Sequence, residues 1–95
     1  MSTIDFGQRL AVPDHVAVRE LDQELVLLNF DSERYFGLDE VGARMVEVLR
    51  GARSIDDGVA TLLDEFEVDE GQLRSDVAEL VTSLVDGGLV VLEPT

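Results

Sequence analysis

The segment from Leu25 to Leu49 constrains the fold of this chain more than any other part of the sequence. Residues 24–30 are apolar at both odd and even positions, which is typical of the central strand of a sheet. A polar break at Asp31-Ser32 follows, and residues 34–38 then form a short strand with little sequence after it that could supply a partner. The unpaired side of such an edge strand exposes N–H and C=O groups that can receive an extended peptide. The sequence therefore predicts an antiparallel meander with an open edge at residues 34–38.

Three helices are expected after this sheet. Asp39, Ser54 and Asp69 can each cap a helix N-terminus, because their side-chain oxygens accept hydrogen bonds from free backbone N–H groups. The first helix should end at Gly51 and the third at Gly87-Gly88. Each helix carries an apolar stripe at helical spacing: Val41, Met45, Val48 and Leu49 in the first, Ile55, Val59, Leu62, Leu63 and Phe66 in the second, and Leu73, Val77, Leu80, Val81 and Leu84 in the third.

The segments outside these elements complete the domain. Val16 to Leu21 alternates as a first strand, Asp22-Gln23 suits a tight turn, and residues 89–92 are apolar enough to return as a strand or an extended tail. Residues 1–14 are mixed in pattern and are expected to form a loosely packed arm with at most one irregular strand. Residues 15–95 then form a single α+β domain, a three-stranded antiparallel sheet plus a three-helix bundle, compatible with a winged helix-turn-helix core.

Composition excludes several classes of protein. A chain of 95 residues with 45% hydrophobic residues makes one small domain, and the lack of cysteine excludes a disulfide framework or a thiol nucleophile. The N-terminus lacks the basic and apolar regions of a secretory signal, and no apolar run reaches membrane-spanning length. We therefore expect a soluble, cytoplasmic domain that does not act at a membrane.

The formal net charge of −14 is unevenly distributed. From Ser54 to Thr95 there are eleven acidic residues and a single base, Arg74. A C-terminal half with this charge would repel the phosphate backbones of nucleic acids. The third helix offers Arg74 as its only base, which disfavours a winged-helix DNA-binding regulator. Solvated helix faces that keep the protein soluble explain most single carboxylates, and attraction of a basic partner is a complementary explanation.

The residues that commonly carry catalysis are scarce. His15 is the only histidine and stands in no recognisable serine or cysteine context, so a surface position suits it better than a general base. The paired acids Asp56-Asp57 and Asp64-Glu65 point to different sides of a helix, which does not suit metal binding. Gly37 and Gly42 lack the lysine and third glycine of a phosphate loop. We expect a protein that is not an enzyme and uses no metal or cofactor.

The aromatic residues divide into two groups. Phe30 and Phe66 lie on apolar faces and are expected in the core. Tyr35 and Phe36 are neighbours on one strand, so their side chains must point to opposite faces of the sheet. Phe36 shares its face with Leu38, but parity alone does not decide which of the two faces is the core.

The run YFGLDEVGARMVEVLRGARSIDDGVATLLDEF, followed by a helix that ends LVDGGLV, resembles the PqqD-like family, also called the RiPP recognition element. The resemblance covers roughly Val16 to Val91, and its most specific pieces are Tyr35-Phe36-Gly37-Leu38, Val41-Gly42-Ala43 and Gly87-Gly88-Leu89. It implies a three-stranded antiparallel sheet beside three helices, in agreement with the order of elements derived above.

The resemblance also implies a function. Such domains bind the leader segment of a ribosomally made precursor peptide as an added strand on the third strand, in the groove beside the third helix. The matching residues here are Glu33, Arg34, Tyr35, Phe36, Gly37 and Leu38 on the strand, with Leu73, Asp76, Val77 and Leu80 on the helix. Asp76 or Glu79 would pair with leader lysines, whereas Leu73, Val77 and Leu80 have the alternative of lying wholly in the core, which we favour for Leu80.

Within the family, Arg19-Glu20-Leu21-Asp22 looks most like the small B1 proteins of lasso-peptide clusters. The implied partner is a separate cysteine protease of the B2 type that removes the leader, and the expected state is a monomer or a weak dimer through exposed edges. The pyrroloquinoline quinone member carries a lysine–leucine–asparagine type of motif where this chain has Tyr35 to Asp39. The alternatives are a chaperone for another RiPP or quinone-cofactor pathway, or an acidic scaffold that binds a basic partner.

Overall fold

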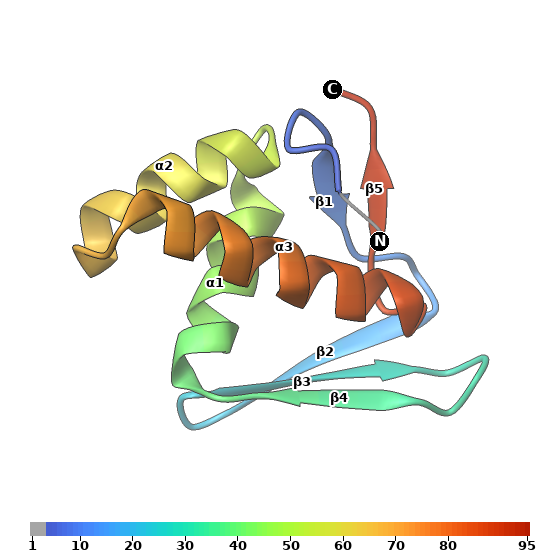
Figure 1. The fold of residues 1–95 in the computed structure, drawn as a ribbon. Coiled ribbons are helices and arrows are strands. Elements are labelled where there is room, and N and C mark those ends of the chain that lie inside the picture. The colour runs from blue at the N-terminus through green and yellow to red at the C-terminus, as the bar shows by residue number, and fades with distance from the viewer. Residues whose placement is uncertain (1–3) are drawn as a thin grey trace.

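The computed structural model describes residues 4–95 of the chain as three helices and two small antiparallel sheets (Figure 1). The sheet of β2, β3 and β4 lies on one side of the helices, and the pair of β1 and β5 stands beside them. In chain order the elements are β1 (Arg9–Ala11), β2 (Val16–Leu21), β3 (Glu24–Asn29), β4 (Tyr35–Leu38), α1 (Glu40–Gly51), α2 (Ile55–Phe66), α3 (Glu70–Asp86) and β5 (Val91–Glu93). The α+β prediction is confirmed.

The three-stranded sheet is the expected meander, in the order β2-β3-β4. Its register pairs Val16 with Asn29 across β2 and β3, and Leu25 with Leu38 across β3 and β4. The turn between β2 and β3 places Asp22 in the left-handed region at φ 59°, which completes a tight turn without a glycine. The central position of β3 follows from its apolar sequence, since both of its backbone edges are paired.

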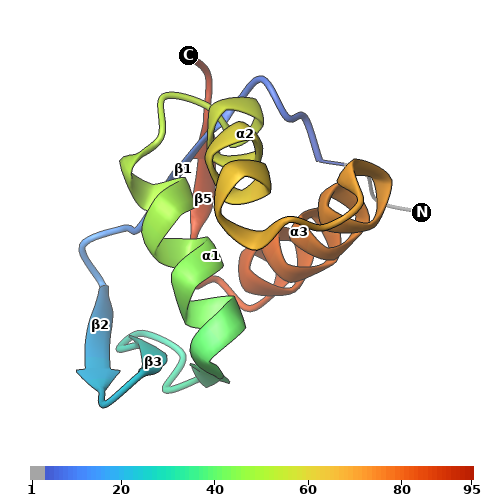
Figure 2. The same cartoon turned by 90° about the vertical axis from the view of Figure 1, so that its left-hand side faces the viewer.

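The three helices begin at the predicted caps. The side chains of Asp39, Ser54 and Asp69 accept hydrogen bonds from backbone N–H groups three residues later, at 2.9, 3.1 and 2.9 Å. Helices α1 and α3 lie next to the inner face of the sheet, and α2 packs on the side of these helices away from the sheet, as the two views in Figures 1 and 2 show. Fully buried side chains from each layer meet between them: Leu25 and Leu27 from β3, Val46 and Leu49 from α1, Leu62 from α2, and Val77, Val81 and Leu84 from α3.

Two apolar residues expected in the core lie outside it. Phe30 is 59% exposed and Val41 is 53% exposed, so both predictions were wrong. Phe30 follows Asn29 on the opposite face of the strand, and that outer face of the sheet has no helix over it. Val41 lies in the first turn of α1, beyond the part of the helix that the core covers. Phe66, by contrast, packs against the core as a half-buried side chain.

The N-terminal arm is more tightly packed than expected. Residues 9–11 pair with residues 91–93, and Leu10 is only 2% exposed. The carbonyl oxygens of Phe6 and Gln8 accept the N–H groups of Asp56 and Ile55 at the start of α2, both at 2.9 Å. The arm therefore supplies the acceptors that the first turn of α2 needs, together with the partner strand of β5. Residues 1–3 of the predicted arm lie outside the described residues.

Within residues 4–95, none of the helices combines the length and the apolar character needed to cross a bilayer.

The packing of the arm leads to a stability prediction. Leu10→Ala should lower the free energy of unfolding by about 2–5 kcal/mol, because it removes a buried side chain and leaves a cavity. Urea denaturation followed by circular dichroism measures this loss. Arg9→Ala, at an exposed position of the same strand, is the control: it removes only the exposed ion pair with Glu93 and should change stability by less than about 1 kcal/mol. A loosely packed arm would instead give the two variants the same stability.

Candidate functional site

The edge of β4 is open on the side away from β3. Within residues 4–95, β4 pairs with no other strand. The N–H of Asn29 donates to the carbonyl oxygen of Arg34 at 2.8 Å, which marks these two residues as a hydrogen-bonded pair of the ladder. Hydrogen-bonded and non-hydrogen-bonded pairs alternate along an antiparallel ladder. Phe36 therefore bonds to β3, whereas the N–H and C=O groups of Tyr35 and Gly37 point to the open edge.

The side chains of β4 alternate in the same way. Leu38 is 6% exposed and Phe36 is half-buried against the core, so these two residues share the inner face. Tyr35 is 74% exposed and shares the outer face with Gly37. A β-carbon built on Gly37 would have no atom within 4 Å, so the outer face of the sheet is sterically open at this residue. Phe36 therefore lies on the core face of the sheet and Tyr35 on the outer face, which the alternation of the sequence alone did not decide.

A hollow of about 560 Å³ lies between the start of β4 and the C-terminal end of α3. It is the part of the expected strand–helix groove that the structure shows as an open cavity. Its lining residues are Glu33, Arg34, Tyr35 and Phe36 on the strand side, and Ser83, Asp86, Gly87 and Leu89 on the helix side.

The expected residues of α3 lie apart from this hollow. Leu73 and Val77 are 2% and 0% exposed and belong to the core, the alternative considered for them from the sequence. Leu80, which we favoured as core, is half-buried and retains an accessible surface. Asp76 is exposed, and its carboxylate accepts a hydrogen bond from the Nε2 of Gln72 at 2.8 Å. None of these four side chains lines the hollow.

Ser83 and Asp86 were missed in the sequence because the direction of α3 across the sheet was unknown. Ser83 follows Leu80 by three residues, and Gly87 follows Ser83 by four, so the three lie along one face of the helix. Extending the proposed contact face by one helical turn from Leu80 would have indicated Ser83. The structure brings the last turn of α3, and not its middle, to the start of β4.

The rim of the hollow carries charges of both signs. Arg34 is exposed and takes part in none of the ion pairs found within residues 4–95. Glu33 stands beside it in the left-handed region at φ 60°, and Asp86 lies on the helix side. This arrangement has polar groups for a peptide's side chains and backbone.

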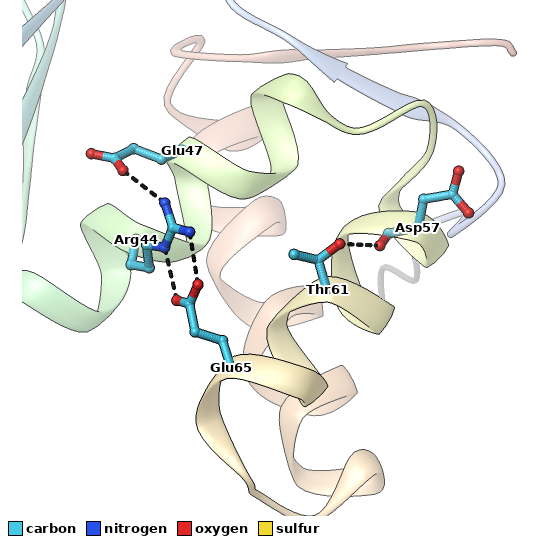
Figure 3. Close-up of polar contacts among 5 residues, drawn as sticks. All are labelled: Arg44, Glu47, Asp57, Thr61 and Glu65. Atoms are coloured by element: carbon cyan, nitrogen blue, oxygen red, sulfur yellow. Dashed lines mark hydrogen bonds and ion pairs between the residues drawn. The ribbon is translucent and has the colours of Figure 1, made fainter.

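A second hollow, of about 410 Å³, lies between the β2–β3 turn and helices α1 and α2. The Arg44 guanidinium on α1 donates to Glu65 on α2 at 2.8 and 2.7 Å, and to Glu47 at 3.2 Å (Figure 3). The hydrogen bond from Arg44 holds the pKa of the Glu65 carboxyl below its usual range. Figure 3 also shows the Thr61 hydroxyl donating to the carbonyl oxygen of Asp57. The Arg44–Glu65 bonds connect α1 with α2, whereas the other two contacts lie within α1 and within α2. Neither helix lines the β4 hollow.

Comparison with known proteins places the chain in a family. Residues 24–90 match the family described as coenzyme PQQ synthesis protein D (PqqD), a span that holds β3, β4 and all three helices. The chain belongs to the PqqD family. A PqqA binding protein from Rhodopseudomonas palustris (strain BisB5) is 27% identical over 90 residues, which cover 93% of this chain and 86% of that protein.

Two solved structures have the same fold. One is TbiB1 in complex with the TbiA(beta) leader peptide, with a TM-score of 0.77 and 29% identity over 84% of this chain and 93% of that chain. The other is a lasso peptide synthetase B1 complexed with the leader peptide, with a TM-score of 0.77 and 30% identity over 87% of this chain and 98% of that chain. Both similarities extend over most of the two chains compared.

Amide hydrogen exchange can test which residues of β4 donate hydrogen bonds to β3. The N–H groups of Tyr35 and Gly37 should exchange much faster than those of Phe36 and Leu38, because only the latter pair donates to β3. Residue-resolved exchange measured by NMR separates the two sets. Equal protection of all four amides would show that the open edge is covered in solution.

Proposed function

We propose that this protein binds the leader segment of a ribosomally made precursor peptide and delivers the precursor to a processing enzyme. The observation that carries the proposal is the open edge of β4, where Tyr35 and Gly37 present unpaired backbone groups beside a hollow lined by α3. The two solved neighbours, each described as a complex with a leader peptide, support it. The relative described as a PqqA binding protein supports peptide binding in a second branch of the family.

The leader would add to β4 as an antiparallel strand. Tyr35 and Gly37 each offer one N–H and one C=O, so up to four ladder hydrogen bonds are available, each of which contributes about 0.5–1.5 kcal/mol net. Main-chain bonds of this kind tolerate different side chains in the bound peptide. Selection of one leader then depends on alternate side chains that enter the hollow between β4 and α3.

The leader site that we propose differs in part from the one expected from the sequence. We assign leader contacts to Glu33, Arg34 and the outward backbone groups of Tyr35 and Gly37, with Phe36 forming the inner wall. Leu38 contributes as a buried anchor of the strand, and Leu80 and Asp76 extend the groove along α3. Ser83 and Asp86 join the set, since they line the hollow directly. Asp76 or Asp86 would pair with a basic side chain of the leader.

We assign the finer role to lasso-peptide biosynthesis, as a non-catalytic B1-type protein whose partner is a separate leader peptidase, the B2-type cysteine protease. The similarity to two B1 structures over more than four-fifths of the chain supports this branch. Precursor peptides are made by ribosomes, so the protein would act in the cytoplasm. A role with the precursor of a quinone cofactor is the second candidate, favoured by the 27% identity to a PqqA binding protein.

The first test uses Tyr35→Pro, which removes a single N–H donor from the open edge without touching the β3 ladder. Fluorescence anisotropy with leader peptides encoded by small open reading frames beside the gene should show a Kd raised by about two- to tenfold, the effect of one lost ladder bond. Tyr35→Ala keeps the N–H and removes the ring, so it separates the backbone contribution from that of the side chain. Unchanged binding by a folded Tyr35→Pro would exclude the edge of β4 from the site.

The second test separates strand addition from attraction by charge. Raising the salt from about 0.1 to about 1 M shortens the Debye length from about 10 to about 3 Å and should weaken leader binding by less than about tenfold. A leader with methylated backbone nitrogens, which cannot donate to the Tyr35 and Gly37 carbonyls, should lose most of its affinity in both salts. Loss of binding in high salt, with no effect of methylation, would favour an acidic scaffold that binds a basic partner.

A further inference from the structure

Asn29 is the only buried polar residue among residues 4–95, at 5% exposure. It lies at the end of β3, with its side chain on the inner face of the sheet. Its Oδ1 accepts the N–H groups of Asp31 at 2.9 Å and Ser32 at 3.1 Å, and its Nδ2 donates to the carbonyl oxygen of Gly88 at 2.8 Å. Only this orientation of the amide satisfies all three bonds, since the reverse would set donor against donor and acceptor against acceptor.

These bonds join the two walls of the hollow beside β4. Asp31 and Ser32 form the turn that leads into Arg34 and Tyr35 on the strand side. Gly88 follows directly after Gly87, which lines the helix side at the end of α3. Asn29 is thus bonded on one side to the turn before β4 and on the other to the residues that end α3.

The backbone conformation of Gly88 and the space around it leave no room for a side chain at this residue. Gly88 adopts φ 70°, a conformation that side chains disfavour, and a β-carbon there would lie 3.0 Å from the Nδ2 of Asn29. Its N–H donates to the carbonyl of Val85 at 3.0 Å, so the carbonyl that Asn29 bonds belongs to a defined turn after α3. Both partners of the bond are therefore held in place by their own backbones.

We propose that Asn29 is a positioning residue of the leader site: its amide sets the separation between the start of β4 and the end of α3. This inference rests on the function proposed above. An added strand must lie against the open edge of β4 while its alternate side chains enter a hollow whose far wall is α3. A groove of fixed width avoids the ordering cost that a loose one would add to binding.

Asn29→Asp keeps the hydrogen-bond acceptor of the side chain and removes its donor. The carboxylate still accepts from Asp31 and Ser32, but it places an oxygen against the Gly88 carbonyl where a donor stood. Gly88→Ala disturbs the same bond from the other end. Val59→Ala is the matched control, since it removes a buried group from α2, which does not line the hollow.

The spacing is measured without any peptide. The chain has no cysteine, so Arg34→Cys and Asp86→Cys introduce two unique sites for nitroxide labels, one on each wall of the hollow. Double electron–electron resonance should give a narrow distance distribution in this background. Adding Asn29→Asp or Gly88→Ala should broaden it or shift it to longer distance, and adding Val59→Ala should not. An unchanged distribution in both groove variants would overturn the proposal, as would equal broadening in the control.

Leader affinity is then measured on the unlabelled proteins by anisotropy with a labelled leader from a neighbouring open reading frame, corrected for the folded fraction of each variant. Asn29→Asp and Gly88→Ala should raise the Kd by about tenfold, the effect of one hydrogen bond, while Val59→Ala leaves it within about twofold. A wider groove with unchanged affinity would overturn the positioning role and leave the proposed function standing. Failure of the unsubstituted protein to bind any such leader would overturn both, whatever the distances show.

Discussion

The antiparallel pairing of β3 with β4 is the interaction on which the rest of the structure depends. Side-chain direction and backbone hydrogen-bond direction both alternate with a period of two along β4. Burial of Leu38 and Phe36 on the inner face therefore also decides that Tyr35 and Gly37 turn their N–H and C=O groups outward. A shift of one residue would expose the core residues and reverse the open edge at the same time, so the packing of the core protects the geometry of the site.

The strong negative charge is largely separate from this edge. Several acids have local structural partners: Asp39 and Asp69 cap helices, and Glu65 and Asp56 bond to Arg44 and Arg74. Neutral backbone groups at β4 provide most of the proposed contact with a leader. In the proposed binding mode, a leader would be held mainly by hydrogen bonds, which salt does not screen.

Local patterns predicted most of the fold. The strand over residues 16–21 and all three helix caps were found where the alternation and the Asp or Ser residues placed them. The prediction that Phe30 lies in the core was wrong, because an apolar residue beside a turn can face solvent when no helix covers its side of the sheet. The packed N-terminal arm was missed because Leu10 is buried by a pairing with residues 91–93, far away in the sequence.

The sequence by itself determined the order of the elements from β2 to α3, the short edge strand and the absence of a thiol, because these depend on residue type and local spacing. The tertiary structure decided which side of the strand is open and which part of α3 faces it. Leu73 and Val77 are core, whereas Ser83 and Asp86 line the hollow. This difference arises from long-range packing of α3 against the sheet. The bond between Asn29 and Gly88, at the end of that helix, is itself such a contact, since it joins residues 59 positions apart. Local periodicity carries no information about such contacts. It shows which face of a helix is apolar, but not which other element that face packs against.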